Sequence, residues 1–154
     1  MDDHRELTDY VTFTTGGMLF GLPIERVQEV FRPARITRVP LSGAQIAGVL
    51  NLRGRIVTAI DMRNRLDLKA RDDGAAPMAI GIESGSESFG LLVDALGEVL
   101  KLPAGEREAN PVNLDRKFAG VSAGVHRLDG QLLVVLDVDC VLDLGGETAP
   151  AAAA

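Results

Sequence analysis

The chain has 154 residues, of which 46% are apolar and 25% charged, and its formal net charge is −6. This is the composition of a globular protein, and no apolar run approaches the ~20 residues that a transmembrane helix requires. Up to residue 71 there are 11 basic and 8 acidic residues, against 5 and 14 in the remainder. Without a dominant basic face, the chain is not expected to bind nucleic acid. The asymmetry suits a protein that meets different partners with different sides, although uneven solvation of two ordinary surfaces explains it equally well.

The first six residues are mixed in charge and no apolar segment follows them, so they do not resemble a secretory signal. We therefore expect a cytoplasmic protein that does not insert into a membrane. The single cysteine, Cys140, cannot form an internal disulfide and lies within an apolar stretch over residues 132–144. We expect its thiol to be buried and inert.

The first half of the chain contains short strands joined by glycine turns. Residues 10–15 alternate between apolar and polar side chains, which is typical of a half-buried strand, and a Gly-Gly turn leads back into residues 18–22. The apolar spacing over residues 24–31 fits either a helical turn or an irregular strand. Further strands are expected at residues 36–40, 46–52 and 55–60.

Two local motifs complete this half. Arg53-Gly54 joins two of the expected strands, and its glycine permits the positive backbone angle of a hairpin turn. Asp61 is placed to cap a single helical turn over residues 61–66. A polar stretch over residues 69–77, rich in Gly, Pro and Asp, then forms the natural boundary.

The same order of segments recurs in the second half. Sliding the sequence by 69 positions places Gly16 on Gly85 and Glu29 on Glu98, and the offset grows to 76 where Asp61 meets Asp137. A residue found in both copies most simply serves the fold they share, whereas a residue found in one copy is free to be functional. The strands expected in this half are residues 79–83, 89–93, 96–102, 120–128 and 131–136, with a long loop over residues 103–117.

About five short strands per copy, with closely spaced turns, most economically close as a small barrel. We predict an all-β fold of two SH3-like five-stranded β-barrels packed side by side, with short helical turns; one continuous sandwich is the alternative. The barrels would comprise about residues 9–71 and 78–144 of a single domain over residues 9–144, and exchange of terminal strands between them is left open. Residues 1–8 and 145–154 are expected to be flexible tails.

Few residues could support catalysis. His126 precedes a turn and is expected to face solvent, and no Cys or His cluster has the spacing of metal ligands. The glycine-rich turns lack the helix and lysine of a phosphate loop. Asp61 and Asp137 recur in both copies, which favours helix capping over catalysis. We therefore expect no catalytic residue, no metal site, no cofactor and no enzymatic activity.

The two copies differ most at one hairpin tip. The first copy has Asn51-Leu52-Arg53-Gly54-Arg55 where the second has Arg127-Leu128-Asp129-Gly130-Gln131, so a cation has become an anion. A rigid turn can aim the planar guanidinium of arginine at a carboxylate at little further entropic cost. An arginine among apolar neighbours resembles the anchor of a protein contact surface, although a stray surface arginine gives the same pattern.

These segments also resemble, in order, the signature of the CheW family. The motif Asn51-Leu52-Arg53-Gly54 with its apolar approach is the most specific part of the match. The resemblance spans about residues 9–144 and rests on residues 10–13, 20–22, 27–30, 46–57, 60–63, 90–94, 98–100 and 133–137.

This resemblance implies two intertwined five-stranded barrels and a scaffold that couples chemoreceptors to the histidine kinase CheA. The groove between the barrels would take the receptor's cytoplasmic tip, and a barrel end would dock on the regulatory domain of the kinase. Glu29 and Arg53 are the implied ion pair. The implied interaction surface comprises Val27, Glu29, Gly48, Asn51, Arg53 and Gly54.

Several readings stay open at this stage. Rings with other CheW-like proteins would be a further assembly, and the location implied is cytoplasmic, at membrane-associated receptor arrays. The same mechanics would serve a pilus-motility or other chemosensory pathway. A small-ligand-binding barrel that uses the groove is the alternative from a different functional class.

Overall fold

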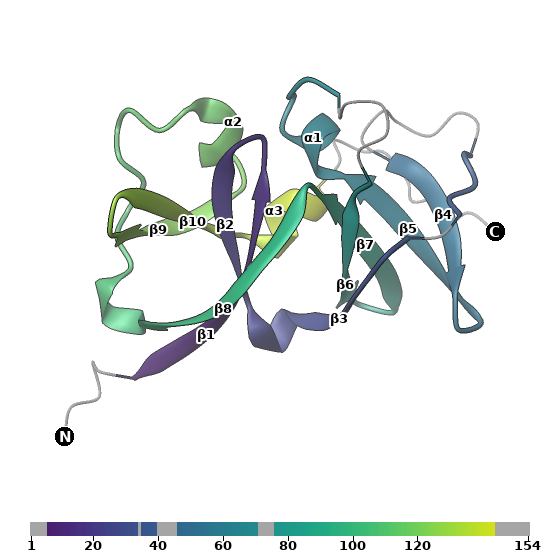
Figure 1. The fold of residues 1–154 in the computed structure, drawn as a ribbon, viewed down its shortest axis with the longest axis horizontal. Coiled ribbons are helices and arrows are strands. Elements are labelled where there is room, and N and C mark those ends of the chain that lie inside the picture. Colours follow the sequence, from purple (N-terminus) through teal and green to yellow (C-terminus); the bar gives the residue numbers. More distant parts are fainter. Residues whose placement is uncertain (1–5, 34, 40–45, 71–75, 144–154) are drawn as a thin grey trace.

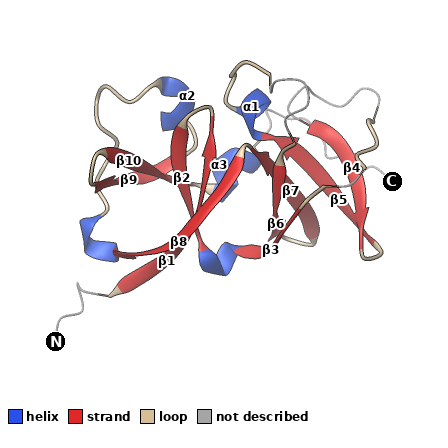
Figure 2. Cartoon of the chain, viewed as in Figure 1, coloured by secondary structure: helices blue, strands red, loops and turns tan. Residues whose placement is uncertain are grey.

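The computed structural model describes residues 6–33, 35–39, 46–70 and 76–143. Its chain is almost entirely β-structure with short helical turns (Figure 2), which confirms the predicted all-β class. The strands are β1 (Leu7–Thr15), β2 (Met18–Pro23), β3 (Val27–Phe31), β4 (Ile46–Leu52), β5 (Arg55–Asp61), β6 (Met78–Ser84), β7 (Glu87–Val93), β8 (Ala95–Pro103), β9 (Ser122–Leu128) and β10 (Gln131–Leu136). The helical turns are η2 (Ile24–Arg26), α1 (Met62–Arg65), η3 (Ala104–Glu106), α2 (Arg116–Ala119) and α3 (Val138–Leu142).

The strands form two five-stranded sheets that stand side by side (Figure 1). Sheet A has the order β8-β1-β2-β10-β9, and sheet B has the order β3-β6-β7-β5-β4. The first hairpin, β1–β2, therefore lies in the sheet completed by the last three strands, so the chain crosses between sheets after β2 and again after β7. Residues 7 and 8, expected in a flexible tail, begin β1 and pair with β8; residues 1–5 and 144–154 lie outside the described residues.

The two sheets are built alike, which explains the repeat in the sequence. In each, the third and fourth strands are parallel, whereas all other neighbours are antiparallel. Val57 pairs with Ser88 in sheet B at the place where Leu133 pairs with Leu19 in sheet A. This register assigns each residue of one sheet an equivalent in the other.

The predicted barrel closure is wrong in one respect, because neither sheet closes through a continuous ladder of paired strands. Single bridges connect the chain beyond one edge strand to the other edge: Thr37 pairs with Val49 in sheet B, and Glu108 with Val125 in sheet A. The strand expected at residues 36–40 is reduced to the Thr37 bridge within its described part. Thus both sheets curl strongly but remain open.

Three apolar cores follow from this curling. The main core lies between the sheets and takes residues from both, including Phe13, Phe20, Ile60 and Leu91. Two smaller cores fill the concave sides of sheet A and sheet B. Residues 133–136 are buried on both faces of β10, because alternate side chains enter the main core and the sheet A core.

Arg63 and Arg65 connect the two sheets through hydrogen bonds near the surface. Arg63 holds Asp94 with two hydrogen bonds, Nε to Oδ1 at 2.9 Å and Nη2 to Oδ2 at 2.6 Å, and Asp94 Oδ2 also accepts from the Gly16 amide at 3.0 Å. Arg65 donates to the carbonyl oxygens of Cys140 and Val141 at the end of α3. Because α3 lies between the two sheets (Figure 1), these contacts fix how the sheets sit against each other.

Local expectations met different outcomes. Asp61 and Asp137 cap α1 and α3 by accepting amide hydrogen bonds, as predicted. For residues 24–31 the sequence fitted either a helical turn or a strand. The segment contains both: the 3-10 turn η2 is followed by the strand β3. The long loop over residues 103–117 begins with η3 and runs into α2.

Two burial expectations are wrong. Cys140 is exposed, because the apolar stretch changes from strand to helix at Asp137 and the helical period turns Val138 and Val141 inward instead. His126 is only 2% exposed, because both faces of β9 are covered. Its ring meets that of Tyr10 edge-on at 5.6 Å between centroids.

Candidate interaction surface

Arg53 lies at the tip of the β4–β5 hairpin in a tightly defined turn. Both tip residues have positive φ, 54° at Arg53 and 84° at Gly54, which is the signature of the type I′ turn favoured in two-residue hairpins. Asn51 Oδ1 accepts a hydrogen bond from the Gly54 amide at 2.9 Å. The local sequence therefore fixes the base of the Arg53 side chain, while the side chain itself is 77% exposed.

Glu29 meets Arg53 although the two come from opposite edges of sheet B. Arg53 Nη1 lies 2.8 Å from Glu29 Oε1 on β3, so the ion pair expected from the family resemblance is present. It spans the open side of the curled sheet, between its first and last strands. The Glu29 side chain is 21% exposed, so its carboxylate is partly screened from water while the arginine stays accessible.

A second cluster of polar side chains, Gln28, Glu83 and Arg55, lies near the Arg53–Glu29 ion pair. Gln28 donates from Nε2 to Glu83 Oε1 at 2.8 Å, and Arg55 approaches both, with 3.5 Å to Gln28 Oε1 and 3.8 Å to Glu83 Oε2. Gln28 and Glu83 lie on the paired strands β3 and β6, and Arg55 adds a link from β5, which pairs with neither of them. Exposed contacts of this kind contribute little stability each, but together they hold β3 in place beside the hairpin tip.

The remaining predicted site residues fall into two groups. Asn51 and Gly54 belong to the Arg53 turn. Val27 is half-buried and packs against the main core. Gly48 has a φ of 149°, and an added Cβ there would collide with the Thr37 carbonyl oxygen. Gly124, its equivalent in sheet A, meets Glu108 in the same way, so Gly48 serves the bridge that both sheets share.

Sequence reasoning missed a cleft beside the ion pair. It has a volume of about 260 Å³, with an apolar floor from Phe31, Leu50 and Leu52 and a basic rim from Arg32 and Arg35. The sequence feature that pointed toward this basic cleft was the excess of basic residues in the first half of the chain. We define the Arg53 surface as Glu29, Asn51, Arg53 and Gly54 with this cleft. It offers cations around an apolar centre, an arrangement that fits an acidic and apolar protein patch.

In the described parts of the chain, no three His, Cys, Asp or Glu side chains are grouped as metal ligands. No helix among these residues is long and apolar enough to cross a bilayer. His126 lies in sheet A, where burial and the nearby Arg107 lower its pKa.

Comparison with known proteins gives a consistent result. The family model for the CheW-like domain matches residues 9–145. The chemotaxis protein CheW of Rhizobium meliloti (strain 1021) is 30% identical over 142 residues, which cover 89% of this chain and 86% of that protein. The chemotaxis protein CheA of Salmonella typhimurium (strain LT2) is 26% identical over 145 residues, which cover 92% of this chain but 20% of CheA.

The fold has a solved counterpart as well. The crystal structure of the scaffolding protein TtCheW from Thermoanaerobacter tengcongensis superimposes with a TM-score of 0.81 at 26% sequence identity. The superposition covers 91% of this chain and 95% of that one.

Proposed function

Because the chain belongs to the CheW-like domain family, we propose that it is a non-enzymatic adaptor that couples chemoreceptors to the histidine kinase CheA in bacterial chemotaxis. Its place of action is then the cytoplasm, at membrane-associated receptor arrays. One observation carries the assignment of the site: Arg53 is fixed at its base by a type I′ turn yet exposed at its tip. An adaptor needs pre-organised surfaces of this kind and no catalytic groups.

The Arg53 surface is the proposed docking site for one of the two partners. Its guanidinium retains donors beyond the single contact with Glu29, so it can bind a partner carboxylate while the ion pair orients it. The apolar floor formed by Phe31, Leu50 and Leu52 lies next to it. An arginine anchor beside an apolar pocket is a common composition for an interface hot spot.

The regulatory domain of the kinase is the proposed partner on the CheA side. A segment of Salmonella CheA resembles nearly the whole of this chain but makes up 20% of that kinase. Two related folds can associate through similar barrel ends. The chemoreceptor tip is the proposed second partner, and the family resemblance implies that it binds between the two barrels.

The test is binding of two fragments to the immobilised chain: the regulatory domain of CheA and the cytoplasmic tip of a chemoreceptor, each alone and then together. Arg53→Asp should weaken binding of one partner about tenfold or more, because it places like charge against Glu29 and the partner. Arg127→Asp is the matched control, since Arg127 forms a similar exposed ion pair with Glu108 in sheet A.

Two outcomes would count against the proposal at different levels. Recovery of neither fragment by the unaltered chain would remove the adaptor function. A large drop in the melting temperature of Arg53→Asp would show that Arg53 is structural, and the site assignment would fall while the function stood.

A further inference from the structure

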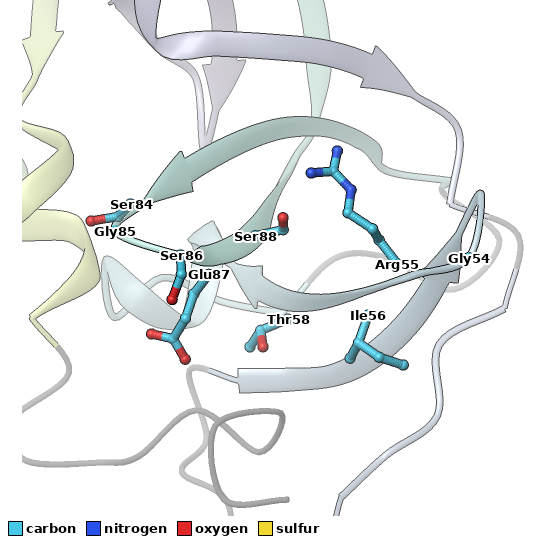
Figure 3. A pocket seen from close by; sticks show the side chains of 9 residues that line it. All are labelled: Gly54, Arg55, Ile56, Thr58, Ser84, Gly85, Ser86, Glu87 and Ser88. Atoms are coloured by element: carbon cyan, nitrogen blue, oxygen red, sulfur yellow. The ribbon is translucent and has the colours of Figure 1, made fainter.

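A second and larger cleft lies in sheet B between the tips of the β4–β5 and β6–β7 hairpins (Figure 3). Its volume is about 750 Å³. In contrast to the cleft beside Arg53, its lining is rich in hydroxyl groups and includes one carboxylate. The hydroxyl groups are those of Thr58, Ser84, Ser86 and Ser88, and the carboxylate is that of Glu87; Ile56, Arg55, Gly54 and Gly85 complete the lining. Nothing in the Arg53 surface accounts for this arrangement.

The strand register determines which of these side chains share a face. Val57 and Ser88 are neighbours on the parallel strands β5 and β7, so Ile56 and Glu87, one residue earlier on each strand, are neighbours on the opposite face. Thr58 shares that face with Ile56. Figure 3 shows the Glu87, Thr58 and Ile56 side chains on one side of the two strands and those of Arg55 and Ser88 on the other.

Glu87 has an unmet capacity to accept a hydrogen bond. Its Oε2 is shielded from solvent, yet no donor contacts it in the described structure. The other acidic residue of this hairpin, Glu83, is already engaged by Gln28 and Arg55 on the opposite face. A shielded carboxylate oxygen without a donor costs free energy. Such a group in a cleft is therefore a candidate for satisfaction by a ligand.

Ile56 adds an apolar contact next to this carboxylate. Ile56 is 52% exposed, so its side chain is accessible to a ligand although the next residue, Val57, is buried on the opposite face. An apolar platform that ends in a carboxylate matches the side chain of lysine or arginine, because both bury an aliphatic stem and present a cation at its end. A charge-assisted hydrogen bond to Oε2 would then satisfy the acceptor.

Sheet A shows that the fold does not require a charge at this place. By the register of the two parallel pairs, Met18 is the equivalent of Glu87 and Leu132 the equivalent of Ile56. Both of these residues are apolar and pack against the main core. The carboxylate is thus an unduplicated feature, like the arginine at the β4–β5 tip.

We infer that this cleft binds a lysine or arginine side chain of a partner protein, with Glu87 as the anion and Ile56 as the apolar platform. The Glu87 side of the cleft differs in charge from the Arg53 surface, which offers cations rather than accepting one. Arg55 also lines the cleft, but it lies on the other face of the strands (Figure 3) and is paired with Glu83. The Glu87 side therefore supplies a second point of attachment that discriminates by opposite charge. This inference does not depend on which proteins the adaptor joins.

The primary test uses a capped arginine, N-acetyl-arginine amide, as the probe and its neutral analogue, N-acetyl-citrulline amide, as the reference. Backbone NMR of the full chain should show saturable shifts confined to Ile56, Thr58 and residues 86–88. In Glu87→Gln, which keeps the side-chain shape, and for the citrulline probe, the fitted affinity should fall about fivefold or more. Asp129→Asn, which removes an exposed acid from the β9–β10 turn of sheet A, is the matched control and should leave the affinity unchanged.

Each other outcome would overturn the inference. Shifts that are absent, spread over the surface, or equal for the two probes would show that the cleft does not select a cation. An unchanged affinity in Glu87→Gln would remove the carboxylate from the site. A thermal melt of Glu87→Gln confirms folding, and Ile56→Ser provides a second variant that must also weaken the arginine probe. Loss of binding by Arg53→Asp with an intact Glu87 site would leave this inference standing.

Discussion

Arg53 at the tip of the β4–β5 hairpin and Glu29 on β3 form an ion pair across the open side of sheet B, with 2.8 Å between Nη1 and Oε1. The two residues lie at opposite ends of the strand order β3-β6-β7-β5-β4. Their contact is therefore possible only because the whole sheet curls until its two edges approach each other. It also leaves most of the arginine exposed, which favours a role in binding over a role in stability.

We predict that Arg53→Ala lowers the free energy of unfolding by less than about 1 kcal/mol, because exposed ion pairs contribute roughly 0.2–1 kcal/mol. A double-mutant cycle with Glu29→Ala, followed by urea denaturation, measures the coupling. The coupling should fall as salt is raised, since the charges are near the surface. A loss of several kcal/mol would mean that the pair closes the sheet structurally.

Gly48→Ala should destabilise the protein by about 1–3 kcal/mol, because the new Cβ would collide with the Thr37 carbonyl oxygen at a backbone angle that disfavours side chains. Gly54→Ala is the matched control. Its φ is also positive, but nothing lies within 4 Å of an added Cβ, so the cost should be smaller. Urea denaturation of both variants measures this. Equal costs would show that backbone angle alone, and not the close approach to Thr37, constrains Gly48.

Arg63→Ala should lower the free energy of unfolding by about 1–3 kcal/mol, because it removes two hydrogen bonds to the half-buried Asp94 carboxylate. Asp94 also holds the β1–β2 turn through Gly16, so hydrogen exchange at the Gly16 amide should accelerate. Arg55→Ala, in a looser and more exposed pair, is the control. Unchanged exchange at Gly16 would contradict a link between the sheets at this point.

The stability of the fold should decrease as the pH falls below about 6.5, the ordinary pKa of histidine. Burial and the nearby Arg107 lower the pKa of His126, although Glu106 and Glu108 oppose this. The unfolded chain then binds a proton more readily than the folded one. This contribution is complete above the unfolded pKa and is lost as pH falls toward the lowered folded value.

His126→Leu provides the test, because the equivalent position in sheet B is Leu50, as the pairing of His126 with Leu133 and of Leu50 with Val57 shows. Chemical denaturation at pH 5 to 8 in both proteins should show a weaker pH dependence in the variant. Parallel stability curves would mean that His126 does not titrate differently on folding.

Features fixed by neighbours in the chain could be predicted. The Arg53-Gly54 turn and the Asp61 and Asp137 caps depend on a few consecutive residues, and the structure contains all three. Burial of single residues was harder to predict. His126 was expected to face solvent because it precedes a turn, but both faces of β9 are covered at Val125 and His126, so His126 is buried.

The candidate site likewise has a part that the sequence predicted and a part that it did not. Arg53 stood out because its tip differs between the two copies, and the resemblance supplied Glu29 as its partner. The apolar cleft beside it could not be predicted, because Phe31 and Leu50 meet there only when the opposite edges of sheet B approach each other. The Glu87 cleft was missed for a related reason, since β5 and β7 are distant in sequence but parallel neighbours in space.

The sequence by itself determined the repeat, most of the strands, the hairpin turns and the family, because hydrophobic period and turn chemistry act over a few residues. Tertiary structure alone decided how strands are shared between the sheets, which faces are buried on both sides, and which side chains meet across an open edge. Those depend on contacts between segments far apart in the chain. A local pattern cannot encode them, since the same alternation serves a strand with one wet face or with none.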